Sequence, residues 1–476
     1  MSLGELRRML DEKKIGAVEL LDEYLKKIKD EDGEINSFIT LLSDEAIASA
    51  RSAQMLIDKG EAKAMTGIPY AAKDNILTKG VLTTCASRML CEYIPPYSAT
   101  VIESLEHQCA VLMGKTNLDE FAMGGSGTSS YFGATKNPKN KNKVSGGSSS
   151  GSAAAVSAGF APVALGTDTG GSVRIPASFC GVVGLKPTYG RVSRYGLVSY
   201  ASSLDQIGVI ANSAEDAGYM LNVIAGQDEM DATSSKAELC DFTDTAKTGV
   251  KDLKIGVIKN LMGSQIDEEV KLAVSDAVRL YEKLGAKVIE VEIPSLEYAL
   301  EAYYIIASAE AASNLARFDG VRYGYAEDGC KSYAEMIAKS RSAGFGQQVK
   351  RRILLGNYLL SDKFGADYYK RAVTAKKRLT EELREVLGRC DVLISPTAPT
   401  AAYGFDECDI LKVCKEDVCT VMVNLSGLPA ISIPCGATSA GLPIGISIIG
   451  KNFSEQKIIV VADVFSDNTN TNWEPG

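Results

Sequence analysis

Apolar residues spaced three or four positions apart fill the first part of the chain and predict helices there. Within residues 1–30 they predict one amphipathic helix, with Ser2 as a possible N-terminal cap. Its apolar face would hold Val18, Leu21, Leu25 and Ile28. Helical patterns continue to Gly60, and further helices are predicted at 99–107, 153–159 and over most of 296–388.

Short apolar runs between the helices predict strands. They cover the segment that ends at Lys73 and residues 110–115, 162–167, 391–395, 430–434 and 444–449. Residues 253–258 and 287–293 flank a helical pattern at 268–284, and this β-α-β order favours a parallel sheet with a helical crossover. The chain is therefore predicted to have an α/β fold.

Length and charge limit the classes of protein that this chain can form. Its 476 residues, of which 45% are hydrophobic, fit about two to three domains or one large α/β unit. The net charge of -9 argues against tight binding of nucleic acid by this chain alone, because such binding needs cations to neutralise phosphates. No apolar run of signal-peptide length follows Met1, which predicts a cytoplasmic protein without a membrane segment.

The eleven cysteines form no recognisable framework. Their number is odd and they are scattered from Cys85 to Cys435, so they are interpreted as reduced and mostly buried thiols. The tightest group, Cys408, Cys414 and Cys419, contains no CxxC pair and has no histidine nearby. No metal site is predicted.

Two Gly/Ser-rich turns stand out between residues 146 and 191. Ser148 and Ser172 each follow a pair of glycines, which are placed where the backbone must bend sharply or approach a ligand closely. The only histidine, His107, ends a helical pattern and is interpreted as a solvated or capping residue. A serine hydrolase with this sequence would therefore need another base.

Lys73 is the candidate base. It follows an apolar segment, and burial could lower its pKa from an ordinary value of about 10.4. Asp74 would act against this shift if its carboxylate pointed inward. The alternative interpretation of Lys73 is a solvated charge at the end of a strand.

The two serines also have alternative interpretations. Ser172 lies between a glycine turn and the helix-compatible segment 173–179, so it could face backbone donors of an oxyanion hole or serve only as a helix N-cap. Ser148 could belong to a flexible loop, to a weak phosphate cradle, or to a relay between a lysine and a nucleophile. A phosphate loop is disfavoured because no lysine follows Gly151.

These motifs resemble the amidase signature family. The matching segments are GIPYAAKDN, GGSSSGSAAAVSAG and ALGTDTGGSVRIPASFCGVVGLKPTYGRVS. The resemblance implies a large mixed, partly parallel, twisted sheet covered by helices on both faces. It also implies a Ser-cisSer-Lys triad in which Ser172 is the nucleophile, Ser148 the relay serine with a cis peptide bond and Lys73 the proton acceptor. The oxyanion donors would be the backbone N–H groups of Thr169, Gly170, Gly171 and Ser172.

Within the family, the chain is most similar to the A subunits of glutamyl-tRNA(Gln)/aspartyl-tRNA(Asn) amidotransferases. Segments such as KTNLDEFAMGGS, YGRVSRYGLVSYASSLDQIG and VNLSGLPAISIPCG carry this similarity. It implies hydrolysis of glutamine recognised by Tyr303, Arg352 and Asp417, since an Asp and an Arg suit the ammonium and carboxylate of an amino acid. Tyr304 and Arg351 adjoin these residues and are alternatives in register.

The same resemblance implies partners. Ammonia would pass through a tunnel to a B subunit of an A, B and C heterotrimer, which binds most of the misacylated tRNA. ATP and Mg²⁺ are expected on that partner, and no cofactor is expected in this chain. The sequence does not determine whether the tRNA carries Glu or Asp.

One large domain is predicted over residues 1–465. It comprises N-terminal helices at 1–60, a catalytic core at 61–210 and a second half with substrate-recognition helices at 250–450, followed by a polar tail at 466–476.

The chain departs from the family pattern at three positions: Ser150 replaces a common glycine, Met422 a common proline and Ser447 a usual glutamine. Two other functions are considered, a stand-alone amidase acting on small amides and an inactive scaffold subunit.

Overall fold

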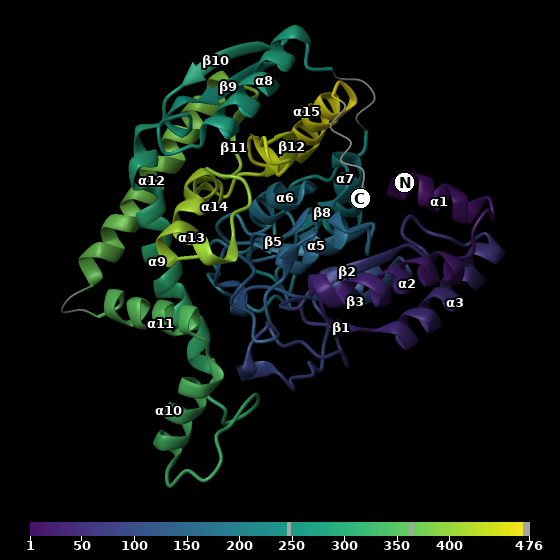
Figure 1. Ribbon diagram of the computed structural model, residues 1–476, viewed down its shortest axis with the longest axis vertical. Helices are drawn as coiled ribbons and strands as arrows, with labels where there is room; N and C mark the ends of the chain where they lie inside the picture. Colours follow the sequence, from purple (N-terminus) through teal and green to yellow (C-terminus); the bar gives the residue numbers. More distant parts are fainter. Residues whose placement is uncertain (245–248, 362–364, 470–476) are drawn as a thin grey trace.

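A twisted 11-stranded sheet organises the computed structural model, which describes residues 1–244, 249–361 and 365–469 (Figure 1). In the described residues its strand order is β1-β3-β2-β6-β8-β7-β12-β13-β11-β9-β10, and β4 and β5 form a separate pair. The strands are β1 (Phe38–Leu41), β2 (Pro69–Lys73), β3 (Val111–Thr116), β4 (Lys136–Asn137), β5 (Asn140–Val144), β6 (Val163–Asp168), β7 (Val183–Lys186), β8 (Gln206–Ala211), β9 (Lys254–Ile258), β10 (Lys287–Val291), β11 (Val392–Pro396), β12 (Ala430–Ala437) and β13 (Pro443–Ile449).

The sheet is mixed, as predicted. Its central strands pair antiparallel, whereas β2 runs parallel to β3 and β6, and β9 runs parallel to β10 and β11. The predicted parallel crossover is confirmed, because α8 connects the parallel strands β9 and β10.

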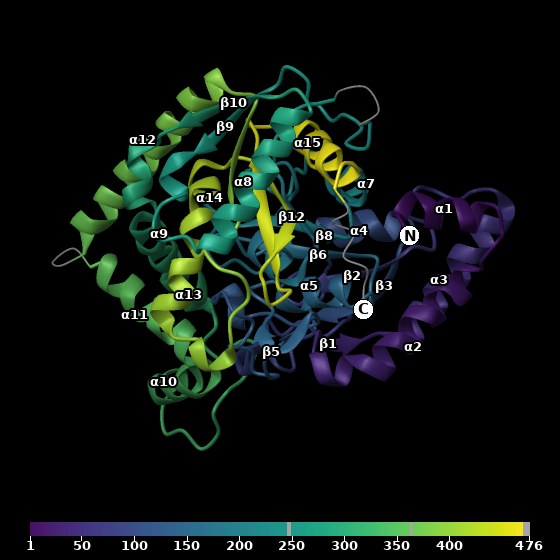
Figure 2. The same ribbon diagram turned by 45° about the horizontal axis from the view of Figure 1, so that its top comes forward.

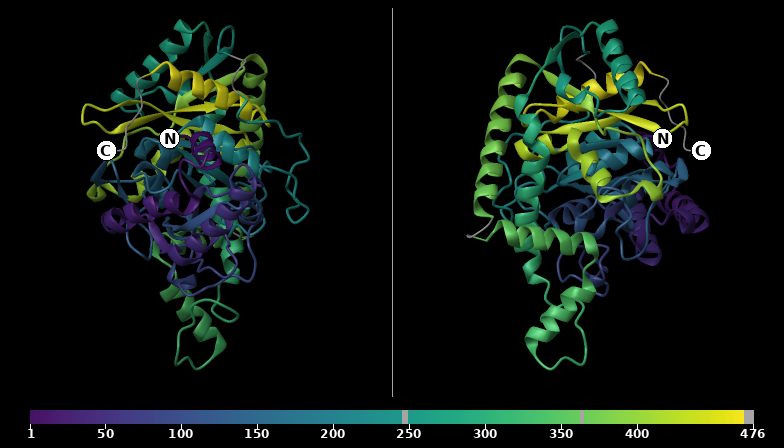
Figure 3. Two further views of the ribbon diagram at one scale, coloured as in Figure 1. Left: turned by 90° about the vertical axis from the view of Figure 1, so that its right-hand side faces the viewer. Right: turned by 60° about the vertical axis from the view of Figure 1, so that its left-hand side comes forward.

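Helices cover both faces of this sheet. They are α1 (Leu3–Asp11), α2 (Ala17–Ile35), α3 (Ser43–Lys59), α4 (Thr100–His107), α5 (Ser150–Ser157), α6 (Arg174–Cys180), α7 (Ala214–Ile224), α8 (Glu268–Lys283), α9 (Ala299–Asn314), α10 (Tyr333–Gly344), α11 (Gln347–Leu359), α12 (Ala366–Arg389), α13 (Ile410–Glu416), α14 (Val421–Ser426) and α15 (Glu455–Asp467). α5 and α6 pack together on one face, while α7, α8 and α15 pack on the other. α9, α11 and α12 pack against one another at one side, and α10 projects from the end of the molecule (Figure 3).

Side-chain spacing explains why such helices dock on the sheet. α8 buries Val270, Val274, Ala277 and Tyr281, which recur every three or four residues and so lie on one face. Its first turn carries two glutamates, which interact favourably with the positive end of the helix dipole.

The N-terminal segment differs from the prediction. Instead of one helix within residues 1–30, α1 and α2 are separate, and the chain turns at Lys13, whose φ is +54° (Figure 2). The predicted cap is confirmed, because the Ser2 hydroxyl accepts a hydrogen bond from the Glu5 N–H at 3.2 Å. β1 then interrupts the helical pattern before α3, because Phe38–Leu41 pairs with β3 at the edge of the sheet.

Two central strands, β7 and β8, were not predicted from the sequence. Every residue of both strands is buried, and a glycine, Gly184 or Gly208, interrupts each short apolar run. A short, uniformly buried run looks the same in a strand and in a buried helix.

The end of the described chain is helical. α15 extends to Asp467, so the polar tail predicted from Ser466 begins inside a helix, and residues 470–476 lie outside the described residues. Within the described ranges, every helix is too short or too polar to cross a membrane.

The sheet topology brings distant turns together. β2 and β6 are parallel neighbours, so their carboxyl ends meet at the same edge. Lys73 ends β2 and Asp168 ends β6, and the turn after Asp168 leads into α6. Side chains at the ends of these two strands therefore lie close together.

Candidate functional site

Lys73 lies at the centre of a buried polar cluster. Its Nζ is 2.8 Å from Ser148 Oγ, 2.9 Å from Ser149 Oγ and 2.8 Å from Thr167 Oγ1. The Lys73 side chain has no solvent exposure, so the alternative of a solvated charge is wrong. Because the parallel strands β2 and β6 end together, they bring Lys73 beside Thr167.

Burial also changes the charge state of Lys73. It lowers the pKa of the amine to about 7, although the carboxylates of Asp119, Asp168 and Asp205 act in the opposite direction. Within the described ranges, none of the three accepts a hydrogen bond from Lys73, whose acceptors are hydroxyls and one backbone carbonyl. A large fraction of the amine is therefore neutral near pH 7, and a neutral amine can accept a proton.

The neighbouring Asp74 points away from this cluster. Its carboxylate lies 3.3 Å from Lys115 Nζ and accepts a hydrogen bond from the Thr84 N–H at 2.8 Å. Both members of this ion pair are fully buried. The sequence left open whether Asp74 raises the pKa of Lys73 and keeps the amine protonated, and its pairing with Lys115 keeps its charge out of contact with the amine.

Ser148 precedes the first turn of α5 and follows a cis peptide bond between Gly147 and Ser148. The Ser148 carbonyl accepts a hydrogen bond from the Asp119 N–H at 3.2 Å. A Cβ added to Gly147 would lie 2.0 Å from an Asp119 carboxylate oxygen, so only glycine fits at that position. This close packing holds the Ser148 hydroxyl against Lys73.

Ser172 lies in the turn between β6 and α6. It is 8% exposed, whereas Lys73 and Ser148 are completely buried, so Ser172 is the member of the group that solvent reaches. Its carbonyl accepts a hydrogen bond from the Ser149 N–H at 3.1 Å, which joins the two serine turns. Val173 occupies the N-cap position of α6 and no side chain caps this helix, so the N-cap interpretation of Ser172 is wrong.

The turn before Ser172 presents buried backbone donors. Among the described residues, no group accepts a hydrogen bond from the N–H of Thr169, Gly170, Gly171 or Ser172. Gly171 has a φ of +142°, which few other residues adopt. Because buried N–H groups are almost always paired, these donors suit a bound oxygen atom.

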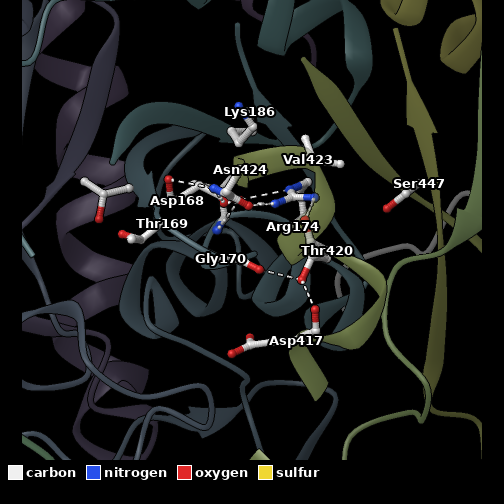
Figure 4. A network of polar contacts seen from close by, with 12 residues as sticks. Asp168, Thr169, Gly170, Arg174, Lys186, Asp417, Thr420, Val423, Asn424 and Ser447 are labelled. Carbon is white, nitrogen blue, oxygen red and sulfur yellow. Dashed lines mark hydrogen bonds and ion pairs between the residues drawn. The ribbon is translucent and has the colours of Figure 1, made fainter. Parts of the chain in front are cut away.

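An ion-pair network supports this turn (Figure 4). Asp168 accepts hydrogen bonds from Arg174 Nε and Nη2, each at 3.0 Å, and from Asn424 Nδ2 at 2.8 Å. Although burial alone would raise the pKa of Asp168, the charge of Arg174 and these hydrogen bonds hold it at about 2. The carboxylate is therefore ionised and fixed at neutral pH.

The same network joins the turn to a segment about 250 residues later in the chain. The Thr420 hydroxyl donates to the Gly170 carbonyl at 2.6 Å and lies 3.2 Å from the Asp417 carbonyl oxygen. A Cβ on Gly171 would lie 2.4 Å from the Thr420 hydroxyl. The segment that carries Asp417 therefore packs directly on the Ser172 turn.

The expected substrate-binding residues form a second cluster beside the turn. Tyr304 donates a hydrogen bond to Asp417 Oδ2 at 2.6 Å, and the Arg352 guanidinium lies 4.9 Å from the centre of the Tyr304 ring. Tyr303 packs against Gly170, where an added Cβ would lie 2.5 Å from the Tyr303 hydroxyl. The structure thus brings Tyr303, Arg352 and Asp417 together.

The sequence left Arg351 as an alternative to Arg352 and Tyr304 as an alternative to Tyr303, and the structure excludes only the first. Arg352 is buried while Arg351 is exposed, so Arg352 is the arginine that reaches this cluster. Both tyrosines reach it, because Tyr303 and Tyr304 pack edge to face with ring centres 5.1 Å apart.

The cluster holds a buried cation and a buried acid that do not pair with each other. In the described ranges, no carboxylate forms an ion pair with Arg352. Burial raises the pKa of Asp417 to about 7, against the lowering effects of the Tyr304 hydrogen bond and the Arg352 charge. A ligand with its own carboxylate and ammonium would compensate both groups.

Sequence reasoning missed several residues of these clusters. Tyr200 accepts a hydrogen bond from Arg352 Nη1 at 2.7 Å, and Ser149 and Thr167 contact Lys73. Ser149 had a signal, since it lies in the serine run that contains Ser148. Thr167 and Tyr200 lie in segments that carry the family resemblance, but only the fold brings their side chains to Lys73 and Arg352.

His107 lies apart from this chemistry, whereas Cys414 and Cys419 lie in the segment that carries Asp417. His107 is exposed at the end of α4, close to the amino end of β3 and therefore at the sheet edge opposite Lys73. Cys419 is buried, whereas Cys408 and Cys414 are half-buried. In the part of the chain that the structure describes, no three His, Cys, Asp or Glu side chains gather as metal ligands.

The three departures from the family pattern are accommodated locally. Ser150 Oγ lies 3.3 Å from Thr135 Oγ1, and Met422 is completely buried in α14. Ser447 Oγ lies 2.9 Å from Thr397 Oγ1, between strands β11 and β12. In the described residues, no hydrogen bond joins the side chain of Ser150, Met422 or Ser447 to that of Lys73, Ser148 or Ser172.

A family model and similar proteins of known name agree on the family to which this chain is similar. A family model described as amidase matches residues 19–459. The A subunit of the glutamyl-tRNA(Gln) amidotransferase of Caldanaerobacter subterraneus subsp. tengcongensis is 50% identical over 467 residues, covering 98% of this chain and 96% of that protein.

Solved structures share the fold. The A subunit of the glutamyl-tRNA(Gln) amidotransferase of Thermotoga maritima is 40% identical, with a TM-score of 0.79 over 95% of this chain and 92% of that one. A peptide amidase from Stenotrophomonas maltophilia is 28% identical, with a TM-score of 0.86 over 98% of this chain and 97% of that one.

Proposed function

The chain belongs to the amidase signature family, and we propose that it is the glutamine-hydrolysing A subunit of a tRNA-dependent amidotransferase. The observation that carries the proposal is the 2.8 Å contact between Lys73 Nζ and Ser148 Oγ, buried beside the solvent-accessible Ser172. The names of relatives that are 50% and 40% identical support the amidotransferase role.

The proposed reaction begins with a proton relay. Neutral Lys73 takes a proton from Ser148, which takes one from Ser172 as the Ser172 oxygen bonds to the side-chain carbonyl carbon of glutamine. The C–N bond then breaks, and the proton returns through Ser148 to the leaving nitrogen, which departs as ammonia. Water attacks the glutamyl ester by the same relay and releases glutamate.

Backbone groups stabilise the charge that develops in this reaction. The tetrahedral oxyanion would accept hydrogen bonds from the N–H groups of the turn at residues 169–172. Removing one oxyanion donor typically slows catalysis by about 100-fold to 1000-fold. The unpaired donors of this turn support that role.

Glutamine is favoured over small uncharged amides because of the second cluster. Arg352 would bind the α-carboxylate and Asp417 the α-ammonium, with Tyr303 placed between them and the Ser172 turn. A stand-alone amidase acting on small amides would not need this pair of charges. Replacing Arg352 with leucine is expected to raise KM for glutamine while leaving the hydrolysis of an uncharged primary amide in place.

The partners belong to the proposal as well. Ammonia would reach a B subunit in a complex with B and C subunits, where ATP and Mg²⁺ activate the carboxylate of a misacylated tRNA. This division of labour agrees with the net charge of -9, which disfavours tRNA binding by this chain alone. The cytoplasmic location stays a prediction.

The decisive experiment uses Ser172→Ala. The variant, purified with the B and C subunits, is expected to lose glutamine hydrolysis by about four orders of magnitude, because a triad acts as a unit. It should still amidate misacylated tRNA when ammonia is supplied. Ser340→Ala, which alters a buried serine in α10, serves as the matched control and should keep both activities.

Two results would contradict the proposal. Glutamine hydrolysis that survives in Ser172→Ala removes the nucleophile assignment. A wild-type chain that forms no glutamyl adduct on Ser172 under any condition supports the scaffold alternative instead.

A further inference from the structure

Asp205 joins the Ser172 turn to a second loop. It is buried immediately before β8, and its Oδ1 accepts a hydrogen bond from the Thr169 hydroxyl at 2.6 Å. Its Oδ2 accepts from the N–H groups of Tyr200 and Ala201, each at 3.0 Å. One carboxylate therefore fixes the first residue of the proposed oxyanion turn and the backbone of Tyr200.

Tyr200 extends this connection to Arg352, which belongs to the second cluster with Tyr303 and Asp417. Its hydroxyl accepts a hydrogen bond from Arg352 Nη1 at 2.7 Å, and its ring centre lies 5.4 Å from the guanidinium carbon. The Tyr200 carbonyl accepts from Asn314 Nδ2 at 3.2 Å, so α9 holds the same residue from the other side. Tyr200 is 2% exposed and has little freedom to move.

Arg352 depends on this support. Among the described residues it has no acidic partner, and its Nε has no hydrogen-bond partner. The Tyr200 hydroxyl is the only hydrogen-bond acceptor of its guanidinium in that part of the chain. Tyr200, Asp205 and Thr169 therefore form a hydrogen-bonded link between Arg352 and the Ser172 turn.

A fixed separation between these two groups selects substrates by length. Asparagine has one methylene fewer than glutamine, so its amide cannot reach Ser172 while its carboxylate stays on a stationary Arg352. A displacement of about 1 Å from reactive geometry can cost about 100-fold in rate. One methylene in a shaped pocket typically changes kcat/KM by about 10-fold to 200-fold.

We propose that Asp205 and Tyr200 are positioning residues that hold Arg352 at the distance from Ser172 that glutamine spans, and so exclude asparagine. The inference rests on the proposed glutaminase function and adds the residues that set its specificity. Neither residue contacts the reacting atoms, and each acts through Arg352 or Thr169.

The test compares glutamine and asparagine as substrates of the full chain in complex with its B and C subunits. Wild-type protein is expected to prefer glutamine by at least about tenfold in kcat/KM. Tyr200→Phe keeps the buried ring and removes the hydroxyl. It should raise KM for glutamine about tenfold, leave kcat within about threefold, and reduce the preference for glutamine.

Asp205→Asn tests the other end of the connection. The substitution removes the carboxylate charge and replaces one acceptor oxygen with an N–H donor, which weakens the contact with Thr169 or with the Tyr200 and Ala201 N–H groups, so the preference for glutamine should again fall. Asp32→Asn is the matched control, because Asp32 is also buried and accepts from the Ser37 and Phe38 N–H groups. Tyr281→Phe is the control for Tyr200→Phe, since the Tyr281 hydroxyl donates to Val461 far along the chain. Both controls should keep the wild-type preference.

A double-mutant cycle separates positioning from a general loss of structure. In an Arg352→Lys background, Tyr200→Phe should have no further effect on the ratio of kcat/KM for the two substrates. An undiminished effect in that background, or a wild-type preference retained by Tyr200→Phe, overturns the inference while the glutaminase function stands. Wild-type protein that hydrolyses neither substrate overturns both.

Discussion

Lys73 has to be neutral before it can accept a proton, and burial decides the pH at which this occurs. Its pKa is lowered to about 7, so the neutral fraction falls as the pH drops below that value. Asp417 has to be ionised to bind the ammonium of glutamine, and burial raises its pKa to about 7. Lowering the pH therefore protonates both Lys73 and Asp417, and each loses its proposed role.

The pH profile follows from these two values. Below about pH 6, kcat/KM for glutamine is expected to fall about 100-fold per pH unit, because both groups must be deprotonated. In Asp417→Asn, kcat/KM should be lower at every pH and should fall only about tenfold per pH unit, because Lys73 alone still titrates. Initial rates between pH 5 and pH 8, at about one-tenth of KM, measure both slopes. A profile that is flat over this range contradicts the assignment of Lys73 as the base.

Lysine itself is needed for this behaviour. Lys73→Arg retains the positive charge but places a guanidinium, which does not deprotonate in proteins, beside Ser148. The variant is expected to show no glutamine hydrolysis at any pH from 5 to 9, and near-wild-type activity in it would show that charge alone suffices.

At the scale of single elements, α5 fixes the two serines that contact Lys73. Its first turn lies against backbone, and a Cβ on Gly151 would lie 2.3 Å from the Ser37 carbonyl oxygen and 2.4 Å from the Asn117 nitrogen. All of the nearest atoms belong to the backbone, so no flexible side chain could move aside to admit a methyl group. The start of α5 can therefore approach β3 only because residue 151 is glycine.

Gly151→Ala should displace this helix start. The expected loss of stability is about 1–3 kcal/mol, since backbone has to shift to admit the methyl group. Because Ser148 and Ser149 precede the displaced turn, kcat should fall as well. Differential scanning calorimetry and glutaminase assays measure the two effects.

Gly33→Ala is the matched control for this change. It lies within α2, and an added Cβ meets nothing within 4 Å. It should leave activity unchanged and stabilise the protein by about 0.5–1 kcal/mol, because alanine loses less backbone entropy in a helix. Equal effects of the two substitutions would contradict the close-approach argument.

At the scale of the whole molecule, α15 is anchored to the segment that follows β7. Glu455, the first residue of α15, accepts a hydrogen bond from the Thr188 N–H at 2.9 Å and pairs with Arg191 at 3.4 Å. Both side chains of the ion pair are almost completely buried. Residues more than 260 positions apart in the chain are joined by this contact.

Glu455→Gln should weaken this anchor without altering the chemistry. The expected loss is about 1.5–3 kcal/mol, which is typical of a hydrogen bond to a charged group. Glu385→Gln breaks an exposed ion pair in α12 and should change stability by less than about 0.5 kcal/mol. Thermal unfolding compares them, and activity per folded molecule should be unchanged in both. A loss of activity without a loss of stability in Glu455→Gln would assign this residue to the site instead.

The sequence by itself identified the candidate residues of the first cluster, and their proposed roles came from the resemblance to the amidase signature family. Ser148 and Ser172 stand in glycine-shaped turns, the single histidine lies outside them, and the apolar segment before Lys73 allowed either a buried amine or a solvated charge. These are local properties, because the bend of a turn, the end of a strand and the environment of a short segment depend mostly on neighbouring residues. The α/β class and the β9-α8-β10 crossover could also be predicted, because they follow from local patterns of apolar residues.

Only the tertiary structure decided how distant segments meet. The partners of Asp74 and Arg174, the choice of Arg352 over Arg351 and the place of Tyr200 depend on contacts between residues far apart in sequence. The central strands β7 and β8 were missed because each apolar run is short and interrupted by a glycine, while their pairing with β12 and β6 depends on the fold. Local sequence therefore identified the candidate reactive groups, and long-range packing fixed their distances and charge states.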